Sequence, residues 1–269
     1  HYRSHSFPTR RSSDLQETII QGANASRWIE IPIVGLSFQT SSLAGLILII
    51  YVSHFLDRKK FKYIKLKSSV FSLWIPVFLI ISLILPSNFS TAALMFLIII
   101  ILLFIGGYPV KRIISMLILA FTFLIFFVLT SKAYPELIPN RVDTWISRIE
   151  SFKNGHDLES NYQIEKAKTA IASGGVLGLG AGKSVMKNFL PQSSSDFIYA
   201  IIIEEFGLIG GLGIIILYLL LLFRIVVIAH KSKKFFGKLI VIGLGIPVVI
   251  QAFVNIGVAL QILPVTGQN

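Results

Sequence analysis

Six long runs of apolar residues, separated by short polar segments, dominate the sequence. They cover residues 40–56, 69–85, 91–107, 113–130, 208–228 and 239–260. Each run is close to the roughly 20 residues that an α-helix needs to cross about 30 Å of hydrocarbon. The pattern predicts an all-α polytopic membrane protein with six transmembrane helices. The composition agrees, because 54% hydrophobic residues in a 269-residue chain are more than a soluble domain of this size could bury.

The net charge of +12 is concentrated in the connections after the first, third and fifth runs. Cytoplasmic loops are enriched in lysine and arginine, so these connections are expected inside the cell and the others outside. The positive charge is therefore explained by membrane orientation and does not indicate nucleic-acid binding. The same orientation puts Asp196 on the extracytoplasmic side. The basic residues are Arg58, Lys59, Lys60, Lys62, Lys65 and Lys67, then Lys111 and Arg112, then Arg224, Lys231, Lys233, Lys234 and Lys238.

The first 15 residues, HYRSHSFPTRRSSDL, are polar, rich in serine and arginine, and without periodicity. They resemble translated sequencing-adapter sequence, the alternative being a disordered basic tail, and they are excluded from functional reasoning. Residues 16–269 are therefore expected to form the membrane domain. Because the sequence stops inside what looks like a motif, we interpret this domain as a fragment.

Cysteine is absent from the sequence, which excludes disulfides, a thiol nucleophile and cysteine-built metal sites. His54, His156 and His230 are far apart and show no metal-ligand spacing. We therefore predict no metal site formed by the side chains of this chain.

The longest polar region, residues 131–195, exceeds a simple connector and is expected to be a large extracytoplasmic loop. Within it, Ile164, Ala167 and Ile171 recur at helical spacing, and Ser173-Gly174-Gly175 would end that helix. This pattern indicates ordered structure at the membrane face or, alternatively, an amphipathic linker resting on lipid headgroups.

The stretch from Gly178 to Ser184, GLGAGKS, invites comparison with a nucleotide-binding P-loop, but Leu177 stands where that pattern requires a glycine. Its glycines are instead expected to allow tight turns close to another backbone or to a headgroup. Lys183 and Lys187 would then be available for phosphate.

A single carboxylate, Asp196, stands where this polar region meets a further apolar helix. Ser195 or Asp196 fits the position of a helix N-cap, an interaction worth about 1 kcal/mol. The helix that follows carries Glu204 and Glu205, and uncompensated charge near lipid costs on the order of 3 kcal/mol each. At about 100° per residue, Glu204 lies about 80° around the helix from Asp196 and Glu205 about 180°, so only Glu204 can serve the same side.

The alternative to an N-cap role is that Asp196 takes part in catalysis. A carboxylate at a membrane surface can take the proton from a sugar hydroxyl as its oxygen attacks an anomeric carbon. A lipid pyrophosphate leaving group would require cations. The loop supplies Arg141, Arg148, Lys166, Lys168, Lys183 and Lys187.

Several motifs, in order and at fitting spacing, resemble those of the SEDS family (shape, elongation, division and sporulation), whose members are of the FtsW/RodA type. Residues 22–29 resemble NGAxRWI, residues 38–44 FQPSELAK, and residues 88–92 the DxGTA turn. Tyr162-Gln163 and the glycines of residues 174–182 resemble the family's long loop. Residues 190–198 resemble LPExHTDFI, residues 204–207 EEFG, residues 255–258 NxGV and residues 263–267 LLPVTG.

The resemblance implies a peptidoglycan glycosyltransferase of the cytoplasmic (inner) membrane that polymerises lipid II into glycan strands. Asp196 stands at the position of the family's essential aspartate and is expected to be the catalytic base. Loop cations, with or without a divalent metal ion, would stabilise the departing undecaprenyl pyrophosphate. The substrate-binding residues are expected to be Arg27, Gln163, Lys183, Lys187, Ser195 and Glu204.

The family also implies partners, namely a class B penicillin-binding transpeptidase and division proteins. The division branch, FtsW-like, is favoured over the elongation branch by the overall resemblance. A SEDS fold usually has ten spans, so six spans would be part of that fold.

The sequence departs from the family pattern at five motif positions, four of which are charged or polar in the family. Thr40, Ser42 and Gly45 replace the Pro, Glu and Lys of FQPSELAK, and Gln192 and Ser194 replace the Glu and His of LPExHTD. Those charges cannot be required here, which leaves Asp196 as the one carboxylate of its motif.

Two other functions fit the sequence. A lipid II flippase could use Glu204 and Glu205 inside a multi-span cavity, and a non-catalytic scaffold of the division or elongation complex needs neither acid. The enzyme is favoured because acids and cations gather on the outer face, where the headgroups of donor and acceptor lie.

Overall fold

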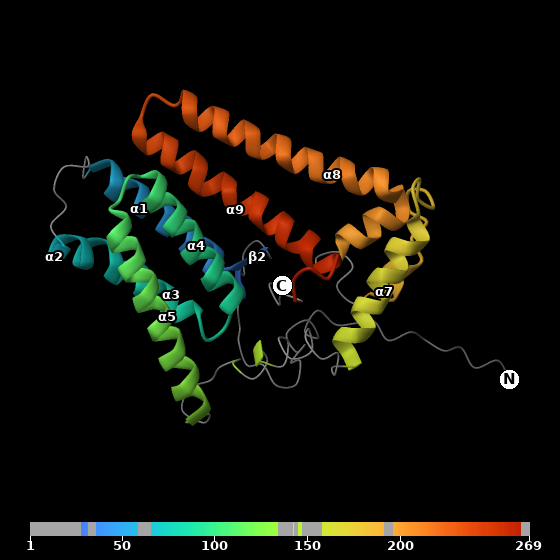
Figure 1. The fold of residues 1–269 in the computed structure, drawn as a ribbon, viewed down its shortest axis with the longest axis horizontal. Helices are drawn as coiled ribbons and strands as arrows, with labels where there is room; N and C mark the ends of the chain where they lie inside the picture. Colours follow the sequence, from blue (N-terminus) through green and yellow to red (C-terminus); the bar gives the residue numbers. More distant parts are fainter. Residues whose placement is uncertain are drawn as a thin grey trace.

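The computed structural model describes residues 28–31, 36–58, 66–133, 142, 145–146, 158–190 and 196–264, and most of its regular structure is α-helix (Figure 1). A short antiparallel hairpin of β1 (Trp28–Ile31) and β2 (Leu36–Gln39) precedes the first helix, with Trp28 opposite Gln39. The sequence predicted only helices, and this hairpin adds a small strand pair to that architecture. The first 15 residues lie outside the described part of the chain.

Each of the six predicted apolar runs contains a helix. The helices are α1 (Thr40–Arg58), α2 (Leu66–Ser69) continuing through the π-helical turn η2 (Val70–Trp74) into α3 (Ile75–Ile84), α4 (Phe89–Ile105), α5 (Val110–Ala133), α7 (Leu158–Gly174), α8 (Ile198–Lys231) and α9 (Phe235–Ala259). Within the described ranges, five helices are long and apolar enough to cross a membrane, the second of them being residues 67–84. The apolar helix α4 has 17 residues.

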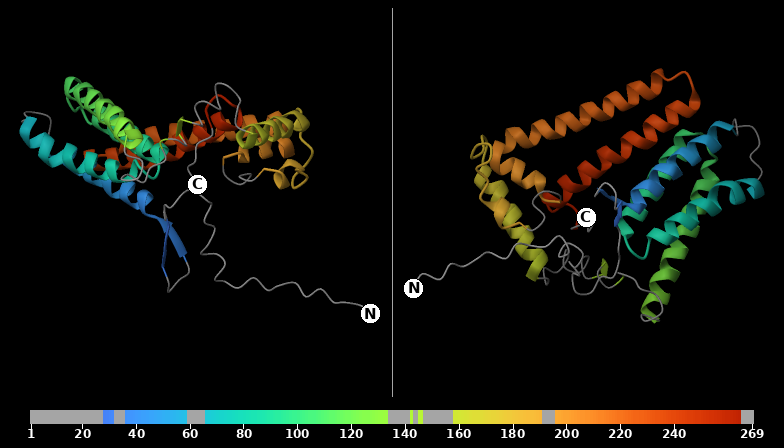
Figure 2. Two further views of the ribbon diagram at one scale, coloured as in Figure 1. Left: turned by 90° about the horizontal axis from the view of Figure 1, so that it is seen from below. Right: turned by 180° about the vertical axis from the view of Figure 1, so that it is seen from behind.

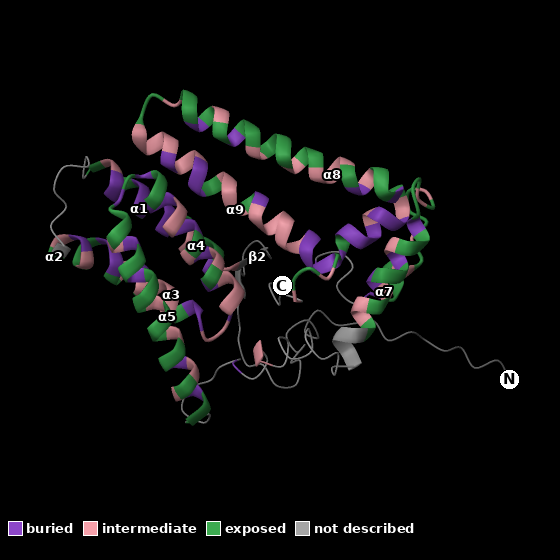
Figure 3. Ribbon diagram, in the orientation of Figure 1, coloured by how far each residue is buried: buried purple, intermediate pink, exposed green. Residues whose placement is uncertain are grey.

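The outward surfaces of the long helices are apolar, as expected of a multi-pass membrane protein. Most of α5 and the outer side of α8 are exposed (Figure 3). Phe121 and Ile118 on α5, and Leu217 and Phe223 on α8, are among the exposed side chains. Surfaces of this kind are stable against lipid, where every backbone polar group is already bonded inside its helix.

The core of the bundle lies where α1, α4 and α9 meet. Leu48, Val52, Leu102 and Leu103 are almost fully buried there. Gly243 of α9 permits the close approach, since a Cβ at that position would lie 2.5 Å from Cγ2 of Ile49. These contacts place α9 beside α1 and α4 although it is separated from them by more than a hundred residues of chain.

A hydrogen-bonded group ties the start of the second span to the connection between α4 and α5. The Trp74 indole donates to the Tyr108 hydroxyl at 3.1 Å, and the Tyr108 and Ser69 hydroxyls share a hydrogen bond. All three side chains are buried. The π-helical turn lies between Ser69 and Trp74, and such turns change which face of a helix its side chains occupy.

The basic connections lie together at one end of the molecule. The end of α1, the turn between α4 and α5 and the turn between α8 and α9 share this end in Figures 1 and 2. Two contacts join them: the rings of His54 and Phe236 are 6.2 Å apart, and a Cβ on Gly106 would lie 2.6 Å from Leu56. The hairpin, α7 and the start of α8 lie toward the opposite end (Figure 1).

We expect Gly243→Val to lower the free energy of unfolding by about 1–3 kcal/mol, because the added side chain must force α9 away from Ile49 and Leu102. Thermal unfolding in detergent, followed by tryptophan fluorescence, measures the change. Gly213→Val in α8 is the matched control, since a Cβ there has no heavy atom within 4 Å. Equal melting temperatures for the two variants would contradict the close packing of α9.

Candidate functional site

Helix α8 is broken at Gly207 into two segments that fold back on each other. Gly207 has φ 70° and ψ −174°, a conformation that is essentially restricted to glycine. A Cβ at Gly211 would lie 3.1 Å from the hydroxyl of Tyr199, although residues 12 positions apart in a straight helix are separated by about 18 Å. The segment from Ile198 to Phe206 therefore turns back toward the end of α9, and it forms a V with the longer segment that starts at Leu208 (Figure 1).

The loop that follows α7 occupies this break. An uninterrupted helix would bond the amides of Leu208 and Ile209 to the carbonyls of Glu204 and Glu205, four residues earlier. Here these two amides bond to the carbonyls of residues 175 and 176, at 3.0 and 3.4 Å. The two carbonyls accept instead from the amides of residues 179 and 180, both at 2.9 Å. Four loop bonds thus replace two helix bonds, and no backbone group of the break is left unpaired in these positions.

Three glycines make this close approach possible. A Cβ on Gly174, Gly178 or Gly207 would lie between 2.0 and 2.2 Å from a backbone carbonyl oxygen of the opposite segment, which no real Cβ can do. Gly178 also has φ +80°. The prediction that glycines of residues 178–184 turn close to another backbone is confirmed for Gly178, whereas Gly182 has open space around it. The predicted helix ends, as expected, at Gly174.

The carboxylate of Glu204 holds the next part of the loop. It is 1% exposed, accepts from the amides of Val185 and Met186 at 3.1 and 3.3 Å, and is also bonded by the hydroxyl of Ser184. Ser184 in turn accepts from the amide of Lys187 at 3.1 Å. A buried carboxylate is stable only when it is hydrogen-bonded in this way. These bonds fix the backbone of residues 184–187 and thereby the starting points of the Lys183 and Lys187 side chains.

The two lysines predicted to bind phosphate, Lys183 and Lys187, are exposed on this loop. A third, Lys166 of α7, lies over the rings of Tyr162 and Phe189, with Nζ 5.3 and 5.8 Å from their centroids. These contacts hold one cation on the side of α7 that faces the short helix η3 (Met186–Asn188). The surface between α7 and the loop is therefore basic.

Asp196 precedes the broken helix and is 1% exposed. The N-cap is Phe197, whose side chain makes no capping hydrogen bond, so Asp196 lies one residue before the cap position that was predicted for it. The residues after it pack in a cluster that joins α7 to the end of α9. Its members include Ala167, Ala170, Leu190, Phe197, Ala200, Ile256 and Val258.

The structure brings the predicted residues together only in part. Glu204 lies beside the segment between Lys183 and Lys187, and Gln163 is half-buried on α7, which packs against the first segment of α8. Arg27 and Ser195 lie outside the described residues. Ser184 was not predicted as a site residue. Its position next to Lys183 was the one sign of a role in the sequence.

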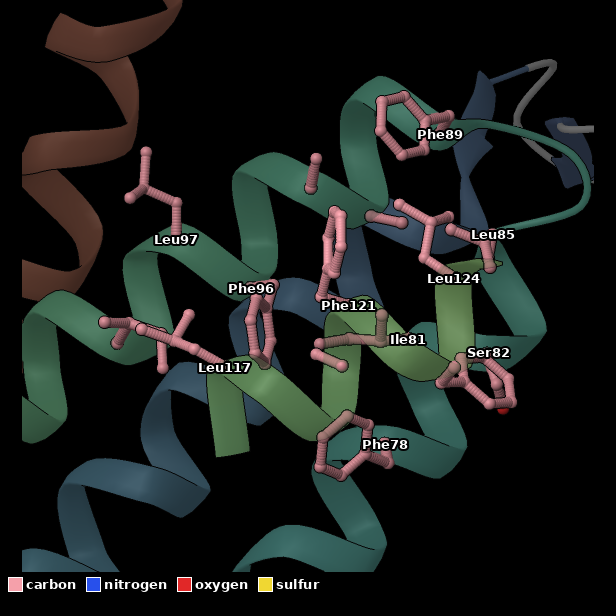
Figure 4. A pocket seen from close by; sticks show the side chains of 15 residues that line it. Phe78, Ile81, Ser82, Leu85, Phe89, Phe96, Leu97, Leu117, Phe121 and Leu124 are labelled. Carbon is pink, nitrogen blue, oxygen red and sulfur yellow. The ribbon is translucent and has the colours of Figure 1, made fainter. Parts of the chain in front are cut away.

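No group of three or more histidine, aspartate or glutamate side chains suited to a metal ion occurs in the part of the chain that the structure describes. An apolar groove of about 430 Å³ lies elsewhere, between α3, α4 and α5 (Figure 4). Phe78, Phe96 and Phe121 line it, and Ser82 is its one polar side chain. The groove suits a hydrocarbon chain and contains no group that could transfer a proton at neutral pH.

Comparisons with known proteins agree on one family. The model of the FtsW/RodA/SpoVE family, described as "Cell cycle protein", matches residues 17–269. Curated relatives include probable peptidoglycan glycosyltransferases FtsW from Nitrosococcus halophilus, 30% identical over 245 residues, and Geobacter sulfurreducens, 34% identical over 248 residues. These matches cover 90% of this chain and 60% and 63% of the two relatives.

Solved structures show the same fold. A chain of a peptidoglycan synthase complex matches with a TM-score of 0.65 at 23% identity, over 92% of this chain and 66% of that chain. The rod shape determining protein RodA of Thermus thermophilus matches with a TM-score of 0.57 at 20% identity, over 92% of this chain and 61% of RodA. The chain spans about three fifths of the length of the curated relatives that it matches.

We expect Gly178→Ala to loosen the loop from the break in α8, because the new methyl group would lie 2.2 Å from the carbonyl oxygen of Glu205. Gly182→Ala is the matched control: both glycines have positive φ, but a Cβ on Gly182 has open space around it. Limited proteolysis in detergent measures the difference. Faster cleavage between α7 and α8 should occur in Gly178→Ala alone, and equal cleavage in both variants would contradict the docked loop.

We expect Glu204→Gln to release residues 184–187, because a neutral amide accepts weaker hydrogen bonds than a carboxylate and cannot serve all three donors equally. Hydrogen exchange of the amides of Val185 and Met186 should become faster, while α9 should exchange as before. Glu205→Gln is the control, since its side chain is only half-buried. The prediction fails if the two variants change loop exchange alike.

Proposed function

The chain belongs to the FtsW/RodA/SpoVE family, and from this premise we propose that it polymerises lipid II into peptidoglycan strands during cell division. The proposed reaction is a glycosyl transfer. A sugar hydroxyl of the acceptor attacks the anomeric carbon of the donor, the acceptor oxygen loses its proton, and undecaprenyl pyrophosphate leaves with the electron pair of the broken bond. The observation that carries the proposal is a buried carboxylate, Asp196, that directly precedes the helix whose Glu204 holds the loop with Lys183 and Lys187.

Asp196 is proposed as the base that receives the proton of the acceptor hydroxyl. A base must be held at hydrogen-bonding distance from the proton it removes, so its backbone has to be rigid. Support for this role comes from the packing of the residue that follows: Phe197 is completely buried between α7 and the end of α9. The packing of Phe197 therefore fixes the backbone position of Asp196, which we place at the membrane surface.

Lys183 and Lys187 are proposed to bind the pyrophosphate as it leaves. Charge develops on the bridging oxygen of the pyrophosphate in the transition state, and ammonium groups near that oxygen lower the barrier. Both lysines are exposed and flank residues whose backbone is fixed by Glu204. We assign Glu204 to this site as the group that positions the cations. Arg27, Gln163 and Ser195 complete the proposed substrate-binding set.

The orientation and partners of the protein follow from the same proposal. The basic turns would lie in the cytoplasm and the loop between α5 and α8 outside the inner membrane, where lipid II headgroups are presented. A solved relative in fold is part of a peptidoglycan synthase complex that couples polymerization with crosslinking. We accordingly propose a class B penicillin-binding transpeptidase and other division proteins as partners.

We expect Asp196→Asn to abolish polymerisation, with a loss of at least about 100-fold, the usual contribution of a general base. The assay uses the full chain in proteoliposomes with lipid II, and gel separation of the glycan products measures its activity. Glu165→Gln on the exposed side of α7 is the control and should retain the activity of the unsubstituted chain. Retained polymer in Asp196→Asn would exclude this residue as base, and headgroup transfer across the bilayer without polymer would indicate a flippase.

A further inference from the structure

The loop that fills the break in α8 carries an exposed apolar surface. Leu177 is 79% exposed, Val176 61% and Leu179 43%. No charged residue interrupts the segment from Gly174 to Gly182. In a loop surrounded by water, three neighbouring side chains of this kind would each be unfavourably hydrated.

This surface continues the lipid-facing surface of the long segment of α8. The carbonyls of Gly175 and Val176 accept from the amides of Leu208 and Ile209, which begin that segment. Leu208 and Ile209 are themselves 49% and 59% exposed. The apolar loop residues therefore lie beside the first turn of a helix whose composition suits the membrane.

The backbone of the loop is suited to the same environment. Non-helical backbone is tolerated at membrane depth only where protein groups satisfy its polar atoms. The amides of Gly178, Leu179 and Gly180 bond to backbone carbonyls of α7 and α8, so these three donors meet that requirement. A loop bonded in this way can enter lipid without leaving these amides unpaired.

Two lysines follow the apolar surface along the loop. Lys183 and Lys187 follow it directly in sequence, and both are exposed. Lysine side chains at a membrane boundary keep their stems in apolar surroundings and place the ammonium group among the phosphates.

We propose that residues 176–179 are inserted into the membrane, with Val176, Leu177 and Leu179 in contact with lipid chains. The insertion holds the loop at a fixed depth beside the break in α8. It brings Lys183 and Lys187 to the level of the lipid phosphates. The proposal concerns the position of the loop in the bilayer and does not depend on the catalytic role of Asp196.

Single cysteines test the proposal directly, because the sequence contains none of its own. The full chain with Leu177→Cys is labelled with an environment-sensitive fluorophore and reconstituted in phosphatidylcholine liposomes. Leu217→Cys on the exposed face of α8 is the lipid-facing reference, and Lys168→Cys on the exposed side of α7 is the water-facing reference. Quenching by brominated lipid and by aqueous iodide is then compared at the three positions.

We expect the label at residue 177 to lose more emission to brominated lipid than to iodide, as at residue 217, and the label at residue 168 to show the reverse. Strong quenching by iodide at residue 177 would place the loop in water and overturn the proposal. Weak quenching by both would mean that protein covers it, which also overturns the proposal. Val176→Cys repeats the measurement at the adjacent exposed position, so that one poorly inserted variant cannot decide the outcome.

Discussion

The rest of the site depends on the exchange of backbone hydrogen bonds at Gly207. Breaking a helix inside or near lipid is costly because freed amides and carbonyls find no water there. In this chain the loop after α7 supplies two acceptors and two donors at the break, so the four freed groups are bonded again. The loop and the helix are consequently one structural unit, and neither conformation is stable without the other.

Glu204 bonds the loop through its side chain as well as through its backbone. Its carbonyl accepts from Leu179 while its carboxylate binds Ser184 and the two amides that follow it. A single residue on the broken helix thus orders both the docked part of the loop and the part that carries the lysines. The position of the lysine-bearing segment therefore depends on one buried acid of the broken helix.

Much of this architecture was predictable from sequence, and the limits have physical causes. The apolar runs identified the membrane helices because the length of a span is fixed by the thickness of the bilayer, and the apolar period from Ile164 to Ile171 identified α7. The break at Gly207 was not predictable from periodicity, since a single glycine between apolar residues does not by itself indicate that a helix turns back. Nor was the bond from Ser184 to Glu204, which joins residues 20 positions apart through the docked loop. The motif predicted a functional role for Asp196, but its place one residue before the cap, with Phe197 at the cap itself, required the structure.

The break in α8 also determines how much of the helix crosses the membrane. A continuous helix of the 34 residues from Ile198 to Lys231 would be about 51 Å long, far more than the roughly 30 Å of hydrocarbon that it has to cross. Its first turns would then stand in water and carry Asp196 away from the bilayer. Because the chain reverses at Gly207, the surplus length is folded back and Asp196 returns to the level of the end of α9. A single glycine thus sets the height of Asp196 relative to the end of α9.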